Sequence, residues 1–251
     1  MKKLSQKERE KIVEKYFGKI PKGKFTPGIY NYCDRWCEKC KKQEKCFLRY
    51  QELREREGLV SEGIDPSSSE AIFNRINNSL DKTKDLILDI TRAEGIDISM
   101  TPEEERQYEL EKRRTDPARY KVMKLAKELF KETHFFIESL PPLESQELNE
   151  EIEKICHHSV TVVCKVFSAM SGKLHAKYEK GSRAKFWLDD SFKTACVAYR
   201  SAKISRGALE TLEVQISDFR FKSLIDRCDK LLTEIDRSLF TNQGRMKGKL
   251  R

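Results

Sequence analysis

Hydrophobic and polar residues alternate along most of the chain with the period of an α-helix. Between residues 69 and 94 apolar side chains recur every three or four positions, and Gly95 follows as a helix stop. The same period continues over residues 116–140, 145–178, 183–211 and 217–239. Because the connections between these segments are short, the pattern predicts five long amphipathic helices in an antiparallel bundle.

The N-terminal quarter has a weaker pattern. Ser5 and Glu8 form a capping-box sequence that predicts a short helix to about Phe17. Glycine and proline predict a loop over 18–28, and a short helix is expected over 47–53. Residues 58–69 are predicted to be a linker. The charged stretch over 101–116 suits a solvated helix or a mobile connection. Asp116 and Pro117 are a favourable cap and first residue for the helix that follows.

These elements predict a mainly α fold, an antiparallel helical bundle preceded by a small cysteine-rich metal-binding segment. The predicted divisions are an N-terminal helix with a four-cysteine module over 1–57, a helical bundle over 66–240 and a basic tail over 241–251. Charged residues make up 36% of the chain and hydrophobic residues 38%, which is typical of amphipathic helices with charged outer faces.

No apolar run reaches the roughly 18–20 residues that a membrane span requires, so no membrane association is expected. The first ten residues have the basic start of a signal peptide but no apolar region after it. We therefore expect a cytoplasmic protein, in which the eight cysteines stay reduced and serve as ligands, core residues or redox groups.

Four of the eight cysteines fall within fourteen residues, spaced C-x3-C-x2-C-x5-C. They are Cys33, Cys37, Cys40 and Cys46. Crowded thiolates repel one another unless a cation neutralises them, so the cluster predicts a metal or iron–sulfur site. Zinc would take all four thiolates tetrahedrally, but zinc modules usually present two short knuckles, and only Cys37-x2-Cys40 is one. A 4Fe–4S cluster accepts ligands spread along one winding loop, so the spacing favours iron–sulfur over zinc.

The C-x2-C-x5-C part of the motif resembles the ligand run of the 4Fe–4S site in CRISPR-associated RecB-like nucleases and in the SPASM domains of radical-SAM enzymes. This resemblance covers about ten residues, and neither family's catalytic residues or β/α barrel are visible in the sequence. The run Tyr32 to Cys46 also resembles the C-D-R-W-C-E-x-C segment of a group of uncharacterised bacterial helical proteins. The counterparts of that group's C-terminal elements are Asp189 to Ala195 and Ile235 to Leu239. This wider resemblance implies a metal-binding helical protein and no particular activity.

The net charge of +9 is concentrated near the motif and at the C-terminus. Residues 19–50 carry nine Lys or Arg against three acids, and the last ten residues add four basic side chains. This excess makes a weak case for nucleic-acid contact, and a solvated surface explains it equally well. The side chains that would contact phosphate are Lys22, Lys24, Arg35, Lys39, Lys41, Lys42 and Lys45.

Other residues offer weaker candidates. His157-His158 with Glu153, and His134 with Glu138, could supply a metal site in the bundle, but the Glu-x-x-His spacing is absent and polar roles in the core or on the surface are favoured. Core packing is predicted for Cys156, Cys164, Cys196 and Cys228. Trp36 and Trp187 are predicted to be packing residues instead of platforms for a ligand. An interhelical polar network or pocket lining is considered for Asp189, Asp190, Lys193, Tyr199, Arg200, Asp236 and Arg237.

The sequence thus predicts a metal- or cluster-binding helical protein, with the cluster serving electron transfer, redox sensing or structural support. The alternative is a zinc-stabilised module that binds a protein or a nucleic acid. An enzyme with a pocket inside the bundle is a third reading, and no substrate-binding motif points to a reaction.

Overall fold

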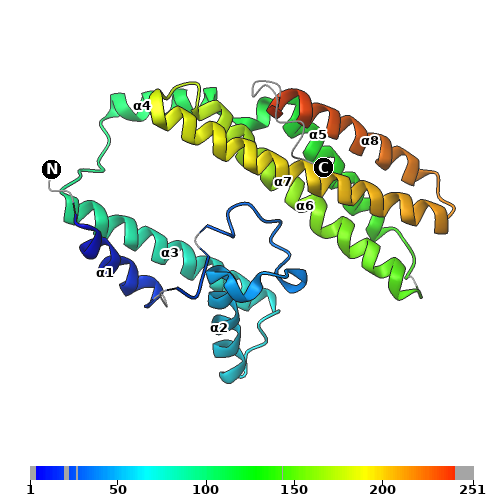
Figure 1. Ribbon diagram of the computed structural model, residues 1–251, viewed down its shortest axis with the longest axis horizontal. Helices are drawn as coiled ribbons and strands as arrows, with labels where there is room; N and C mark the ends of the chain where they lie inside the picture. Colours follow the sequence, from blue (N-terminus) through cyan, green and yellow to red (C-terminus); the bar gives the residue numbers. More distant parts are fainter. Residues whose placement is uncertain (1–3, 20–22, 27, 143, 241–251) are drawn as a thin grey trace. The chain divides into compact units, whose positions relative to one another are not determined.

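The computed structural model describes residues 4–19, 23–26, 28–142 and 144–240 (Figure 1). Over these residues the chain forms eight α-helices joined by loops and short 3-10 or π turns, with no strand. The prediction of a mainly helical fold is therefore confirmed. The predicted basic tail and Lys22 lie outside the described residues. The chain divides into two compact units, residues 1–30 with 37–108, and residues 31–36 with 109–251.

The second unit is an antiparallel four-helix bundle. Its helices are α5 (Lys121–Glu138), α6 (Gln146–His175), α7 (Gly181–Gln215) and α8 (Arg220–Ile235). Each helix packs against the next, and α5 packs against α8 to close the ring. Neighbouring helices run in opposite directions in Figure 1, as expected for helices joined by short loops.

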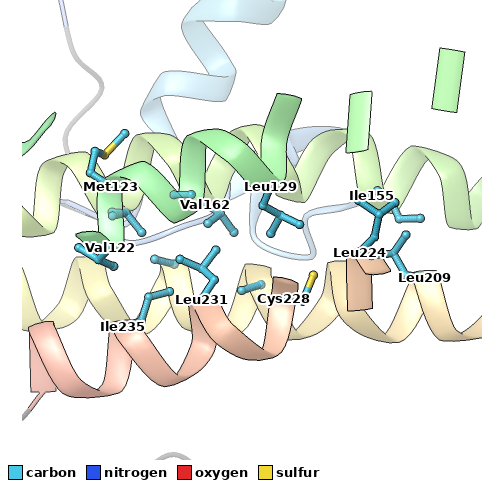
Figure 2. Close-up of a cluster of buried hydrophobic side chains, with 14 of the residues drawn as sticks. Val122, Met123, Leu129, Ile155, Val162, Leu209, Leu224, Cys228, Leu231 and Ile235 are labelled. Atoms are coloured by element: carbon cyan, nitrogen blue, oxygen red, sulfur yellow. The ribbon is translucent and has the colours of Figure 1, made fainter. Parts of the chain in front are cut away.

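Most residues of the apolar stripes predicted from the helical period lie in or against the core of this bundle, although Leu188 of the predicted α7 stripe is 38% exposed. In α5 the predicted stripe is buried throughout, from Val122 to Phe136. Figure 2 shows the side chains of α5, α6, α7 and α8 gathered along one seam, with Cys228 among them. Burying one such aliphatic side chain contributes about 1.5–3 kcal/mol, so this seam is the main source of stability in the unit.

Helices α6 and α7 approach each other closely because small residues face one another. Ser191 of α7 donates a 2.7 Å hydrogen bond from its hydroxyl to the carbonyl of Ala169 in α6. One turn along α6, Gly172 faces the same part of α7, where an added Cβ would lie 3.2 Å from the Ser191 Cβ. The close approach therefore depends on the lack of a side chain at Gly172.

The first unit contains α1 (Gln6–Phe17), α2 (Phe47–Ser61), α3 (Ser69–Glu94) and the first half of α4 (Pro102–Arg114). The predicted capping box of α1 is present, with the Ser5 and Glu8 side chains each bonded to the other's backbone N–H. Helix α1 packs on α3, where Lys15 and Tyr16 both bond the Asp89 carboxylate, at 2.7 and 2.6 Å.

The partner of α3 differs from the sequence prediction. Its bounds and its stop at Gly95 are as predicted, but it belongs to the unit of α1 and α2 instead of the predicted bundle region 66–240. Its apolar stripe is largely open to solvent, with Ile76 51% and Leu80 63% exposed. The helical period identifies an amphipathic face but not the element that covers it.

The end of α2 and the start of α5 also differ from the prediction. Helix α2 continues to Ser61, well past residue 53, so the loop that follows begins later than the predicted linker. Asp116 does act as a cap, but of a 3-10 turn (Pro117–Arg119) that precedes α5. The charged stretch over 101–116 forms the exposed helix α4. In the part of the chain that the structure describes, no helix has the length and apolar character needed to cross a bilayer.

Candidate metal-binding segment

Three of the four clustered cysteines lie on successive tight turns of the first unit. Cys37 opens a 3-10 turn (Cys37–Lys39), and the N–H of Cys40 donates to the Cys37 carbonyl at 3.3 Å. A second 3-10 turn (Gln43–Lys45) leads to Cys46, whose N–H donates to the Gln43 carbonyl at 3.1 Å. Cys46 then precedes the first turn of α2. Such compact turns shorten the path between ligands that are close in sequence.

A backbone hydrogen bond already points at one of the sulfurs. The N–H of Lys42 donates to Cys40 Sγ at 3.4 Å. Hydrogen bonds to sulfur stabilise the thiolate form and tune the potential of an iron–sulfur cluster. The contact places one backbone donor at the Cys40 sulfur.

A buried arginine lies beside the same turns. Arg49 in α2 is buried and pairs with Glu38 at 3.3 Å and with Glu52 at 3.0 Å. Burial opposes its charge, but the hydrogen bond to Glu52 and the negative charges of Glu52, Glu38 and Cys37 outweigh burial and raise the pKa of Arg49. Its positive charge favours an anionic group at Cys37.

The first unit has almost no hydrophobic core. Among its described residues only Cys46, Arg49 and Ala71 are buried. Phe25 packs edge-on against Phe47 and joins the loop to α2, with ring centroids 5.4 Å apart. A unit with so few buried residues usually needs a disulfide or a metal to stabilise it.

The fourth cysteine belongs to the other unit. Cys33 lies in residues 31–36, which cluster with the four-helix bundle, and its side chain is partly buried. Within the described residues, no three side chains of His, Cys, Asp or Glu are gathered closely enough to hold a metal ion. The four-cysteine site therefore stays a prediction. No family model, curated protein or solved structure matches this chain.

The histidines proposed for a bundle metal site have other roles in the structure. His157 contacts the backbone carbonyl of Asp34 through Nε2 at 2.9 Å. His158 is buried, and burial, followed by the charge of His157, lowers its pKa to about 4. His134 pairs with Glu138 on the exposed face of α5 at 3.2 Å. The favoured reading of core and surface polar roles describes all three.

The four scattered cysteines do not share one environment. Cys228 is fully buried, as predicted, and burial raises the pKa of its thiol to about 12. Cys156 and Cys196 are partly buried, and burial raises both thiol pKa values. Cys164 is exposed, so the prediction of core packing is wrong there. It lies just beside the buried stripe of α6, where a small angular offset decides exposure.

Several of the polar residues considered for a network instead make separate contacts. Lys193 pairs with Asp189 one turn away on the exposed face of α7, at 2.6 Å, and Arg237 pairs with the buried Glu234 of α8 at 2.7 Å. Asp190 accepts a 3.0 Å hydrogen bond from the Tyr32 hydroxyl. Both tryptophans stack on histidines, as packing residues would. The pairs are Trp36 with His157 and Trp187 with His175.

Sequence reasoning missed the residues that hold the cysteine segment. Thr161 and Lys165 contact backbone carbonyls of residues 34 and 31, and they follow His157 at intervals of four. The available signal was this row of polar residues at a spacing of four, which places them on one face of the helix. The role of Arg49 was also missed, although it follows Cys46 by three residues.

Proposed function

We propose that this protein binds a metal centre through Cys33, Cys37, Cys40 and Cys46. The spacing favours a 4Fe–4S cluster over zinc, and the cluster would serve electron transfer, redox sensing or structural support. A cytoplasmic location, where thiols stay reduced, is part of the proposal.

The observation that carries the proposal is the poor core of the unit that contains three of these cysteines. Its described residues bury only Cys46, Arg49 and Ala71. Hydrophobic burial therefore provides little of the free energy that orders its turns. Metal binding by thiolates contributes about 10–16 kcal/mol in small zinc peptides at neutral pH, which is more than enough to order such a segment.

Two local features support thiolate ligands. The Lys42 N–H donates to the Cys40 sulfur, and Arg49 places a buried positive charge beside Cys37. Both features lower the cost of holding negative charge on sulfur.

The test is anaerobic purification followed by measurement of iron, zinc, acid-labile sulfide and the visible spectrum. A 4Fe–4S cluster predicts iron and sulfide in equal amounts, with broad visible absorption from sulfide-to-iron charge transfer. Cys40→Ser should lose the metal, whereas Cys164→Ser, which changes an exposed cysteine of α6, should retain it. Stoichiometric zinc without sulfide would refute the iron–sulfur assignment, and protein without any bound metal would refute the site.

The second candidate is a zinc-stabilised module that binds a protein or a nucleic acid. It is favoured by the exposure of the lysines in the cysteine-bearing unit. These are Lys24, Lys39, Lys41, Lys42 and Lys45. Phosphate contacts through them predict affinity that falls steeply as salt rises. Binding to an unrelated RNA or DNA duplex that does not change with salt would exclude the nucleic-acid form of this function.

A further inference from the structure

The segment that carries Cys33 is bound along one face of α6. His157, Thr161 and Lys165 are spaced by four residues, so their side chains lie in one row on the helix. The His157 ring contacts the Asp34 carbonyl at 2.9 Å, and the Thr161 hydroxyl lies 3.3 Å from the same oxygen, sharing its one proton with the His157 carbonyl at 3.0 Å. Lys165 Nζ donates to the Asn31 carbonyl at 3.2 Å. Because a carbonyl oxygen only accepts, His157 carries its proton on Nε2.

Side chains of the segment strengthen this attachment. Trp36 stacks on His157 with ring centroids 4.7 Å apart and planes 24° apart, and it meets the His158 ring edge-on at 5.4 Å. At the other end, the Tyr32 hydroxyl donates to Asp190 of α7 at 3.0 Å. The segment is therefore held at its backbone by α6 and at its side chains by both helices.

The backbone between Cys33 and Cys37 is strained. Arg35 has φ of 66°, and it is the single non-glycine residue with positive φ in the described chain. Such a conformation costs about 1–3 kcal/mol and persists only where surrounding contacts enforce it. The contacts with α6 and α7 meet that requirement, because they bind the chain on both sides of Cys33.

We propose that His157 is a positioning residue for the metal ligand Cys33, and that the row of His157, Thr161 and Lys165 on α6 presents this cysteine to the metal. This inference rests on the proposed function. The carbonyls of residues 31 and 34 flank Cys33, so fixing both of them restricts the cysteine backbone before any metal arrives. A ligand held in advance loses less conformational entropy when it binds, which raises affinity.

The same contacts make metal binding and attachment of the segment thermodynamically linked. Any ligand that binds the attached form better than the released form stabilises the attached form. By reciprocity, attachment strengthens metal binding by the same factor by which bound metal strengthens attachment, so weakening the attachment lowers metal affinity. His157 therefore affects the metal although it is not itself a ligand.

The experiment compares metal affinity in the full-length protein, measured by competition between cobalt(II) or zinc(II) and a chromophoric chelator. His157→Phe keeps an aromatic ring for Trp36 but loses the hydrogen-bond donor, and His157→Gln keeps a donor but loses the stack. Changing a partner that orients a metal ligand costs about 10–100-fold in affinity, and we expect about 10-fold for each variant here. His134→Phe, on the exposed face of α5, is the matched control and should leave affinity unchanged.

A second measurement follows the attachment itself without metal. In a Trp187→Phe background Trp36 is the sole tryptophan, and its emission reports whether it stacks on residue 157. Metal-free His157→Gln should shift this emission towards that of a solvated indole, while the helical circular dichroism stays unchanged. Thr161→Val removes the hydroxyl that shares its proton with the Asp34 carbonyl and leaves the stack in place, so it should also weaken metal binding, by less than the His157 variants. It replaces them in the test if either His157 variant fails to fold.

The outcomes separate the two proposals. A parent protein that holds no iron–sulfur cluster after anaerobic purification and binds neither cobalt(II) nor zinc(II) overturns the proposed function and this inference with it. A parent protein that binds metal, with His157 and Thr161 variants of equal affinity, overturns only the positioning role. Weaker binding in the variants, together with released Trp36 and an unchanged control, supports it.

Discussion

The close approach of α6 and α7 predicts different effects on stability for the same substitution at two glycines. In Gly172→Ala the new Cβ would lie 3.2 Å from the Ser191 Cβ and 3.2 Å from the Trp187 carbonyl oxygen. Both atoms are close to the α7 backbone, so relief requires the two helices to separate. Overpacking of this kind costs about 1–3 kcal/mol. In Gly207→Ala the new Cβ meets no atom within 4 Å.

Both glycines lie inside helices, so alanine contributes the same gain in helix propensity, about 1 kcal/mol, at each site. Gly207→Ala should therefore raise the free energy of unfolding by about 1 kcal/mol. The free energy of unfolding of Gly172→Ala should be lower than that of Gly207→Ala by about 1–3 kcal/mol, which is the packing cost alone. Urea unfolding followed by circular dichroism measures both variants. Equal stabilisation by the two substitutions would refute the inferred helix contact.

Three further predictions concern the two units. The pKa of His158 is about 4 in the folded protein, so between about pH 6.5 and 4 the unfolded state binds a proton that the folded state does not, and acid destabilises the fold. His158→Gln should remove this destabilisation. A urea midpoint that depends on pH as in the parent protein would contradict the prediction. Burial alone would raise the pKa of Glu234, but hydrogen bonds from Ser238 and Arg237 outweigh burial and lower it. The ionised Glu234 carboxylate therefore stabilises the fold above the unfolded pKa of about 4.3, and this stabilisation is lost as pH falls. Glu234→Gln should flatten the dependence of the urea midpoint on pH below about pH 4, and an unchanged profile would exclude this stabilising role of Glu234. Leu80→Gln on the exposed face of α3 should change stability by less than about 0.5 kcal/mol. Leu129→Ala in the bundle should lower the free energy of unfolding by about 2–5 kcal/mol. Thermal unfolding measures both variants, and a loss of stability in Leu80→Gln as large as in Leu129→Ala would mean that this face of α3 is buried.

The helices were predictable because their signals are local. The period of α5, its buried stripe and the capping box of α1 follow from side chains three or four positions apart. The end of α2 was not predicted, because Gly58 suggested a break that the helix passes through. A single glycine costs only about 1 kcal/mol, and neighbouring turns compensate for it.

The candidate site divides in the same way. The cysteine spacing is a local property and was read from the sequence, while the metal it favours follows from that spacing alone. The buried Arg49 beside Cys37 could not be read in advance, because arginine is usually exposed and its burial depends on Glu38 and Glu52.

By itself, the sequence determined that the chain is helical, where most helices lie and that four thiols are concentrated in one short segment. Only the tertiary structure decided that α3 lies outside the bundle and that residues 31–36 bind to α6. The contact between Asp34 and His157 joins residues 123 positions apart. Helical period and cysteine spacing depend on the geometry of a few successive residues. The choice of partner depends on shape and hydrogen-bonding complementarity between distant surfaces, which no local pattern encodes.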